Sequence, residues 1–167
     1  PYIDFNKLEA VIFDFDGVFT DNTVLVSSDG SELVRFSKSD SLGVSLFKDY
    51  LRERTINLRL IVLSKEQNMI VAHRAKKMNL QCFQGVDQKS TFILDELKIG
   101  MGGYIYFGND VNDLEAMQGA FLSFAPIDCH PKVKDVATIV MTERGGHGFV
   151  RSGLDLIMTN NNSEMEN

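Results

Sequence analysis

The chain has 167 residues, of which 44% are hydrophobic and 24% charged, an ordinary composition for one folded domain. Seventeen lysines and arginines stand against 23 aspartates and glutamates, so the formal net charge is −6. This acidic balance, without a long basic run, disfavours nucleic acids and anionic membrane surfaces as partners.

Short apolar runs alternate along the chain with stretches of helical periodicity. In chain order, the runs predict strands at residues 10–15, 58–63, 80–83, 104–107, 121–124 and 138–141. The helical stretches are residues 42–51, 67–78, 88–97, 111–117 and 149–158. Continuous apolar strands that alternate with helices indicate a parallel sheet covered on both faces. We therefore expect an α/β fold with a Rossmann-like sheet.

One segment interrupts the alternation. Residues 23–26 and 32–36 flank Ser28-Asp29-Gly30, a pattern that predicts a small β-hairpin inserted after the first strand. We expect the polar tail, residues 159–167 (TNNNSEMEN), to be disordered. Because there is no internal repeat and no Pro/Gly-rich linker, we predict a single domain over residues 1–158.

The cysteines and the apolar runs indicate a compartment. Cys82 and Cys129 are far apart in the sequence and form no C-x-x-C pair, so we expect reduced thiols; a disulfide is the alternative. No secretory apolar segment is present, and no run approaches the roughly 18 residues of a membrane-spanning helix. These features predict a cytoplasmic protein without a membrane partner.

The most informative pattern is Asp14-Phe15-Asp16-Gly17-Val18-Phe19-Thr20-Asp21, directly after the first apolar strand. Ligands of open α/β sheets bind outside the carboxyl ends of the strands. Two carboxylates two residues apart can point at one centre there, while the glycine lets the chain turn sharply. Buried acids need compensation, which a bound cation supplies. The alternative, a solvated loop with incidental acids, would explain a bare D-x-D better than the full pattern.

This pattern resembles the first signature of haloacid-dehalogenase (HAD) superfamily phosphatases. In that family the first Asp attacks phosphorus and forms an aspartyl-phosphate, and the second protonates the leaving alcohol and later activates water. The resemblance implies that Asp14 is the nucleophile and Asp16 the general acid and base. Thr20 and Asp21 would support the loop.

Two further residues match HAD signatures in their expected order. Ser64 ends the strand at 58–63, where the family places a Ser or Thr that binds the phosphoryl group beside a helix N-terminus. A plain helix N-cap is the alternative for this serine. Lys89 matches the lysine that neutralises the nucleophile and the transferring phosphoryl group. For this lysine the alternative is a solvated helix end.

The fourth signature is represented by GNDVND, which follows the strand at 104–107. The resemblance implies a Mg²⁺ cofactor held by Asp14, by the backbone carbonyl of Asp16 and by this loop. Close relatives carry G-D-D-x-x-D, whose first Asp is the direct ligand, whereas this chain has Asn109. A neutral oxygen binds Mg²⁺ less strongly than a carboxylate. We therefore expect a weakened site in which Asp110 or Asp113 compensates.

Other marks resemble the capless sugar-acid phosphatase branch, over nearly the whole chain. They are D-G-V-F-T-D, the hairpin, Ser39-Asp40-Ser41-Leu42-Gly43, Phe83-Gln84-Gly85 and Arg144-Gly145-Gly146-His147-Gly148 followed by Arg151. The branch contains 3-deoxy-manno-octulosonate 8-phosphate phosphatase of lipopolysaccharide biosynthesis and 2-keto-3-deoxynononate 9-phosphate phosphatase. It also contains the carboxy-terminal domain of some N-acylneuraminate cytidylyltransferases (CMP-sialic acid synthetases). The resemblance implies a homotetramer in which a neighbour's hairpin or carboxy-terminal segment helps close the active site.

The choice of substrate depends on the residues after the strand at 58–63. Octulosonate enzymes usually carry T-G-R at the second signature, whereas this chain has Ser-Lys-Glu with Glu66 in third place. Together with Arg74 and Lys77, this glutamate resembles the nononate phosphatases, so a nononate or N-acylneuraminate 9-phosphate is favoured over octulosonate 8-phosphate. A solvated basic helix face is the alternative for Arg74 and Lys77. His147 either gates a neighbouring site or is an ordinary loop histidine.

Two functions remain open at this stage: a Mg²⁺-dependent phosphatase of a 2-keto-3-deoxy sugar acid phosphate, and a catalytically weak tetramerisation domain of an N-acylneuraminate cytidylyltransferase. The first is favoured by the complete set Asp14, Asp16, Ser64 and Lys89. The second is favoured by Asn109 and by a start at Pro1 without a methionine, from which we expect one domain of a longer, fused chain. The cytidylyltransferase chemistry itself is not expected here, because no Gly-rich nucleotide-binding loop follows the first strand.

Overall fold

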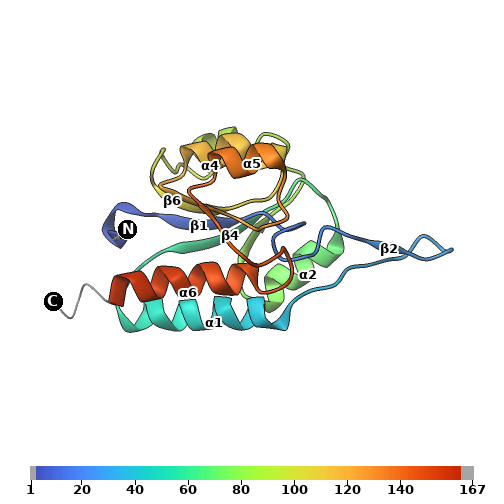
Figure 1. Ribbon diagram of the computed structural model, residues 1–167, viewed down its shortest axis with the longest axis horizontal. Coiled ribbons are helices and arrows are strands. Elements are labelled where there is room, and N and C mark those ends of the chain that lie inside the picture. The colour runs from blue at the N-terminus through green and yellow to red at the C-terminus, as the bar shows by residue number, and fades with distance from the viewer. Residues whose placement is uncertain (1–2, 163–167) are drawn as a thin grey trace.

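Six parallel strands form the central sheet of the computed structural model, which describes residues 3–162 (Figure 1). The strands are β1 (Ala10–Phe13), β4 (Arg59–Leu63), β5 (Gln81–Phe83), β6 (Tyr104–Phe107), β7 (Leu122–Ala125) and β8 (Ile139–Val140). Their order across the sheet is β5-β4-β1-β6-β7-β8. After β5 the chain crosses back over β1 to begin β6, so the strand order reverses there. Such a reversal opens a crevice at the carboxyl ends of the strands.

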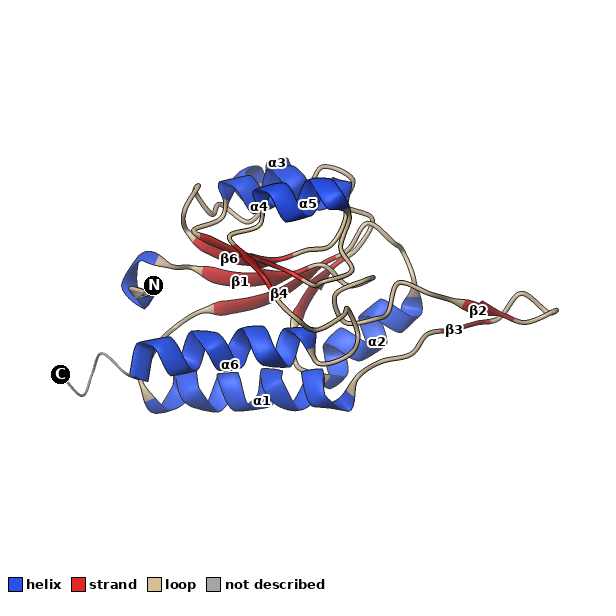
Figure 2. Ribbon diagram, in the orientation of Figure 1, coloured by secondary structure: helices blue, strands red, loops and turns tan. Residues whose placement is uncertain are grey.

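Helices cover both faces of the sheet (Figure 2). One face carries α1 (Lys38–Glu53), α2 (Met69–Lys77) and α6 (Phe149–Asn162), and the other carries α3 (Lys89–Asp95), α4 (Leu114–Gly119) and α5 (Pro131–Val136). Two short 3-10 helices, η1 (Phe5–Lys7) and η2 (Val111–Asp113), complete the elements. Side chains of β1 alternate between the two cores: Val11 and Phe13 pack with the α1 side, and Ala10 and Ile12 with the α3 side. The predicted α/β fold is confirmed.

A buried carboxylate joins α1 to α6. Asp40, in the first turn of α1, accepts hydrogen bonds from the backbone N–H of Gly148 (3.3 Å) and of Arg151 (2.8 Å), at the start of α6. An acid at a helix N-terminus satisfies free N–H groups and the helix dipole. Burial raises the pKa of Asp40, and these backbone donors oppose that rise. Asp40 therefore gives the SDSLG pattern a structural role away from the chemistry.

Several boundaries differ from the sequence prediction. The sequence pattern missed α5, whose six residues are too few to show a helical period. The predicted disordered tail begins too early, because α6 continues to Asn162. Asn161 is buried, accepts a hydrogen bond from Ile3 N (3.2 Å) and donates one to Ile3 O (2.8 Å), a long-range contact that polar composition cannot reveal. Residues 163–167 of that predicted tail lie outside the described residues.

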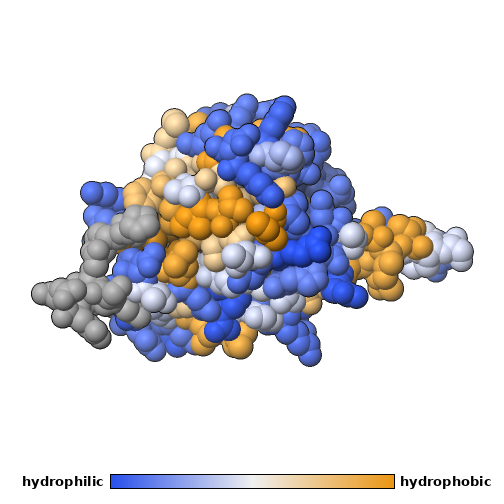
Figure 3. Space-filling view, in the orientation of Figure 1, coloured by the Kyte–Doolittle hydropathy of each residue, from blue (hydrophilic) through white to orange (hydrophobic). Residues whose placement is uncertain are grey.

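The predicted hairpin is present and projects from the body of the molecule (Figures 1 and 2). It consists of β2 (Leu25–Val26) and β3 (Glu32–Leu33), paired antiparallel. Its apolar side chains are exposed, with Leu25 at 71% and Leu33 at 67% of full exposure, and Figure 3 shows them as a separate hydrophobic area.

None of the described helices is long and apolar enough to cross a bilayer.

Candidate active site

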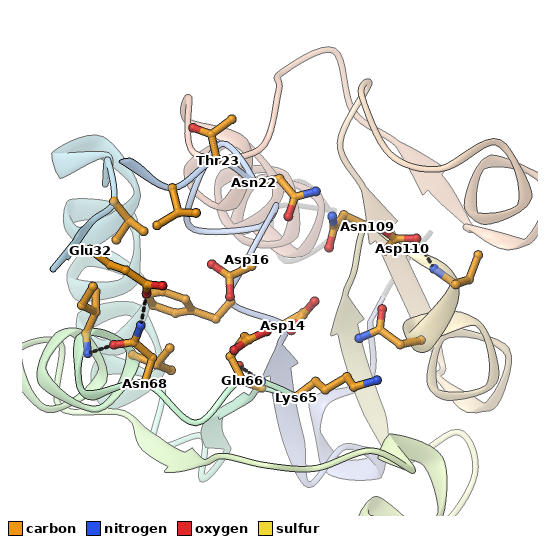
Figure 4. A pocket seen from close by; sticks show the side chains of 18 residues that line it. Asp14, Asp16, Asn22, Thr23, Glu32, Lys65, Glu66, Asn68, Asn109 and Asp110 are labelled. Carbon is orange, nitrogen blue, oxygen red and sulfur yellow. Dashed lines mark hydrogen bonds between the residues drawn. The ribbon is translucent and has the colours of Figure 1, made fainter. Parts of the chain in front are cut away.

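The carboxyl ends of β1, β4 and β6 open into a cleft of about 510 Å³ (Figure 4). Its walls come from the loop after β1, the hairpin, the loop between β4 and α2, and the loop after β6. The polar residues that line it are Asp14, Asp16, Asn22, Thr23, Glu32, Ser64, Lys65, Glu66, Asn68, Asn109, Asp110 and Asn112. Figure 4 shows Asn109 and Asp110 on one side of Asp16, and Glu32 and Asn68 on the other. The cleft thus brings the first, second and fourth predicted signatures together at one edge of the sheet.

Asp14 lies at the bottom of this cleft, immediately after β1. Its backbone N–H donates to Phe107 O (2.9 Å), which extends the β1–β6 pairing by one bond and fixes the start of the loop. Its carboxylate Oδ1 lies 2.7 Å from Lys89 Nζ. Burial, then the nearby charge of Asp113, raises the pKa of Asp14 to about 7, although Lys89 opposes the rise. At neutral pH this carboxylate therefore favours either a proton or a further cation beside it.

Lys89 is a buried cation held between two carboxylates. It is 2% exposed, and its Nζ lies 2.7 Å from Asp14 Oδ1 and 2.7 Å from Asp113 Oδ1. Burial by itself would lower the pKa of Lys89, but the two carboxylates outweigh it and the net shift is upward. A lysine in this position stays charged. The alternative of a solvated helix-end lysine is wrong.

Asp113 organises the loop after β6. Its Oδ2 accepts the backbone N–H groups of Asn109 (2.9 Å) and Asp110 (3.2 Å), and its Oδ1 accepts Lys89 Nζ and the hydroxyl of Tyr106 (2.8 Å). With these contacts and no exposed surface, Asp113 is not a free metal ligand. The sequence indicated Asp113 as a compensating ligand and missed Tyr106. The tyrosine is indistinguishable from an ordinary core residue of the YIYF strand.

Asp16 faces the cleft and has an environment suited to an acid. Thr20 Oγ1 donates to Asp16 Oδ1 (3.3 Å) and accepts the backbone N–H of Gly17 (3.2 Å), which ties the loop to itself. Burial raises the pKa of Asp16; the charges of Glu66 and Glu32 add to this, and the Thr20 hydrogen bond opposes it. A carboxyl group with a raised pKa can hold the proton that a leaving alkoxide needs.

Asn109 packs directly on Gly17. The glycine has φ +80°, and a Cβ built on it would lie 1.9 Å from Asn109 Nδ2, so only glycine leaves room for this amide. In one orientation the amide NH₂ donates to Asp16 O (2.8 Å) and Asp14 Oδ2 (3.3 Å). In the other orientation the amide oxygen of Asn109 faces Asp16 O and Asp14 Oδ2. These three oxygens have no hydrogen between them, so a cation is required to hold them together.

These three oxygens fit Mg²⁺. Octahedral Mg²⁺ has ligands at about 2.0–2.1 Å, so neighbouring ligand oxygens lie about 2.9 Å apart, close to the spacing of Asp16 O and the Asn109 amide. No group of three or more His, Cys, Asp or Glu side chains in residues 3–162 forms a metal site. The oxygen set described here contains only one such side chain, Asp14, because its other two oxygens come from an amide and a backbone carbonyl. Asp110 lines the cleft nearby, and its Oδ1 accepts Val111 N (2.7 Å) at the start of η2.

The second signature lies opposite this oxygen cluster. Ser64 is buried, and its Oγ accepts the backbone N–H of Glu66 (3.1 Å). The N-cap of α2 is Asn68, whose side chain accepts Ile70 N (2.8 Å), so the alternative of Ser64 as a helix N-cap is wrong. Lys65 also lines the cleft and pairs with Asp87 at 3.4 Å.

Three predicted substrate residues do not line the cleft of this chain. The guanidinium of Arg74 lies 3.9 Å above the Phe36 ring and donates to Ser41 Oγ (2.7 Å). Lys77 is exposed at the far end of α2, which starts at the cleft and rises about 12 Å over the eight steps from its first residue to its last. His147 is exposed, with Nδ1 2.8 Å from Gly145 O. Helical spacing could not show that α2 points away from the site.

The RGGHG loop packs against the loop that follows β1, residues 14–21. Gly146 N donates to Val18 O (3.0 Å), and a Cβ on Gly145 would lie 2.0 Å from Gly17 O. Because two backbones meet here without side chains between them, the loop holds the turn that follows Asp16. The motif is recognisable in the sequence, but its packing against the turn is not.

The chain is similar in sequence and in fold to known phosphatases and to a HAD family hydrolase. No protein-family model matches the chain. The sequence is similar to 3-deoxy-D-manno-octulosonate 8-phosphate phosphatase of Salmonella typhi, with 27% identity over 156 residues, 91% of this chain and 80% of that protein. The fold is similar to that of a HAD family hydrolase from Streptomyces avermitilis, with a TM-score of 0.81 and 34% identity over 95% of each chain.

A third similar protein was solved with ligands. It is 3-deoxy-D-manno-octulosonate 8-phosphate phosphatase of Moraxella catarrhalis, in complex with a magnesium ion, a phosphate ion and KDO. The TM-score is 0.83 and the identity 25%, over 97% of this chain and 94% of that one. Each of the three likenesses covers more than nine tenths of the present chain, and so takes in the sheet together with its helices.

Proposed function

Because this chain belongs to the HAD hydrolase family, as a phosphatase of its sugar-acid branch, we propose that it hydrolyses the phosphate ester of a 2-keto-3-deoxy sugar acid with Mg²⁺ as cofactor. The observation that carries the proposal is that Asp14 and the amide of Asn109 line one cleft, with the buried ammonium of Lys89 directly against Asp14. A nucleophile, a fixed cation and an oxygen cluster for a metal are the parts that phosphoryl transfer requires.

In the proposed mechanism Asp14 attacks phosphorus, and the bond from phosphorus to the sugar oxygen breaks as Asp16 gives that oxygen its proton. Asp16 then takes a proton from water, whose oxygen attacks the aspartyl-phosphate and releases phosphate from Asp14. Lys89 neutralises the nucleophile and the transferring group throughout. Ser64 is placed at the cleft to donate its hydroxyl to a phosphoryl oxygen. Bound Mg²⁺ supplies charge that lets an anionic ester approach an anionic nucleophile.

Two members of this substrate class are supported by different observations. The relatives named above support octulosonate 8-phosphate. Glu66, which lines the cleft where octulosonate enzymes carry arginine, supports a nononate or N-acylneuraminate 9-phosphate, and this is the substrate we propose. The experiment is to measure kcat/KM for both sugar phosphates with saturating Mg²⁺. A higher value for the octulosonate would overturn the nononate preference alone. Absence of phosphate release from both would overturn the phosphatase proposal.

The alternative function, a weakly active assembly domain of a cytidylyltransferase, is favoured by Asn109 and by the exposed hairpin. Fusion to such a domain is part of that alternative, and the full-length gene sequence decides it. For the compartment we propose the cytoplasm, since Cys82 and Cys129 are free thiols.

Replacing the amide of Asn109 by a carboxylate tests whether this residue holds the metal. Asn109→Asp keeps the size of the side chain and adds a negative charge beside Asp14, so we expect Mg²⁺ to bind about tenfold more tightly and turnover to rise. Calorimetric titration with Mg²⁺ and phosphate release provide the two measurements. Asn112→Asp, a control with the same added charge in the same loop, should change the affinity much less. Flat affinity and turnover in Asn109→Asp would remove this residue from the coordination sphere and transfer its role to Asp110.

The exposed hairpin supports the tetramer that the resemblance to the sugar-acid phosphatase branch implies. Leu25 and Leu33 face each other across β2 and β3 and are mostly exposed, and a lone hairpin gains stability only by packing on a larger surface. We expect sedimentation to show a tetramer at micromolar concentration. Leu25→Asp should shift it toward smaller species, while Ser28→Asp at the turn should leave it intact. A wild-type monomer at that concentration would contradict the prediction.

A further inference from the structure

Tyr106 carries a buried hydroxyl that does not reach the cleft but contacts its machinery. The residue lies on β6 beside Ile12 of β1, and it is completely buried. Its Oη is 2.8 Å from Asp113 Oδ1, the same oxygen that accepts the hydrogen bond of Lys89 Nζ at 2.7 Å. The tyrosine and the catalytic cation therefore share one acceptor atom.

The shared acceptor determines where the ammonium of Lys89 lies. Oδ2 of Asp113 is fixed by the backbone N–H groups of Asn109 and Asp110, so the carboxylate cannot rotate without breaking those bonds. A carboxylate without exposed surface needs donors on both oxygens. If the tyrosine hydroxyl were removed, Lys89 would be the one donor to Oδ1 among residues 3–162. Asp113 would then be held less firmly, and it would no longer fix the ammonium against Asp14.

We propose that Tyr106 is a positioning residue, whose hydroxyl satisfies Asp113 so that the ammonium of Lys89 stays against Asp14 and the transferring phosphoryl group. Burial, followed by the charges of Asp113 and Asp14, raises the pKa of Tyr106 well above its ordinary value, so the hydroxyl remains a donor. The inference rests on the proposed phosphatase function, because a phosphoryl group gives the fixed cation its catalytic role.

The strand itself supplies a matched control. Tyr104 lies two residues earlier on β6, is also buried, and its hydroxyl donates to Ala116 O (2.7 Å) in α4. Tyr104→Phe therefore removes one equally buried hydrogen bond that does not touch Lys89 or Asp113. A loss that follows only from a weakened core should affect both tyrosine variants alike.

The test compares Tyr106→Phe with Tyr104→Phe in saturating Mg²⁺, with para-nitrophenyl phosphate as probe. For Tyr106→Phe we expect kcat to fall about tenfold, the loss that a hydrogen bond to a charged group supports, with KM within about twofold of wild type. NMR of ¹⁵N-lysine-labelled protein, assigned with Lys89→Met, should show hydrogen exchange of the Lys89 ammonium accelerated about tenfold or more. Tyr104→Phe should leave kcat and this exchange near their wild-type values.

Exchange of the ammonium does not depend on turnover, so it decides the inference separately. An unchanged exchange rate in Tyr106→Phe would overturn the inference, whatever the kinetics. So would a Tyr104→Phe variant that lost as much kcat. If the wild-type protein released no phosphate but Tyr106→Phe still freed the Lys89 ammonium, the positioning of Lys89 would stand and the proposed function would fail.

Discussion

Asp14→Asn is expected to release no phosphate from any sugar acid phosphate while remaining folded. The amide cannot attack phosphorus, so the aspartyl-phosphate cannot form. Lys89 keeps its ion pair with Asp113 at 2.7 Å, and no buried cation is therefore left unpaired by the substitution. Phosphate release with saturating Mg²⁺ measures the loss. Asp49→Asn, the same chemical change at a surface ion pair of α1, should retain full turnover. Wild-type turnover in Asp14→Asn would exclude the family mechanism for this chain.

The same variant should change the dependence of stability on pH. In the metal-free protein the pKa of Asp14 is raised from 3.8 to about 7 by burial and by Asp113, so the folded state binds a proton more tightly than the unfolded state. The resulting stabilisation is complete below pH 4 and is lost as the pH rises through about 7. Asp14→Asn has no carboxyl group to titrate there, so its stability does not fall in this way as the pH rises. In thermal unfolding without metal, the Tm of the variant relative to that of wild type should therefore be higher at pH 8 than at pH 4.

Asp16→Asn is expected to lower turnover of the sugar phosphate by about 10²–10⁴-fold, the usual contribution of a general acid and base. Mg²⁺ affinity should be retained, because the backbone carbonyl of Asp16, which lies beside the Asn109 amide, is unchanged. Para-nitrophenyl phosphate provides a sharper measurement. Its leaving group needs no proton, so the first step should proceed and the second, which needs a base, should be slow. Rapid mixing should then show a burst of about one nitrophenolate per site.

The control for Asp16→Asn lies in the same loop. Asp21 is half-buried, and its carboxylate accepts the backbone N–H of Thr23 (3.2 Å), a bond that an amide oxygen can also accept. Asp21→Asn should therefore keep most of the activity. If both variants lost equally, the loss would come from a disturbed loop. If Asp16→Asn retained more than about a tenth of wild-type kcat, another group would have to carry the proton.

The sheet and the loop that follows β1 were predictable because their signals are local. The strand ending at Phe13 is continuously apolar, and the Asp14 pattern follows it directly, so the position of the two carboxylates depends only on how strands end. The hairpin was equally predictable from Ser28-Asp29-Gly30 between two extended runs. In each case the deciding residues are neighbours in the sequence.

The remainder of the site depends on contacts between distant segments. Neither the meeting of Lys89 with Asp113 nor the hydroxyl of Tyr106 on the same oxygen has a periodic signal, because three separate elements supply the partners. Arg74 shows the opposite error. Its spacing on α2 suggested a substrate-binding face, but the guanidinium packs on the Phe36 ring and donates to the hydroxyl of Ser41 instead of lining the cleft.

The close packing of Asn109 on Gly17 restricts how this enzyme can be altered by directed evolution. Position 109 tolerates an exchange between amide and acid, since both have the same shape and their codons differ by one base. Position 17 offers no such freedom, because even a methyl group there would meet the 109 side chain at 1.9 Å. A mutant library should therefore hold Gly17 constant and vary residue 109, the metal ligand that we propose, so that the turn beneath it is kept.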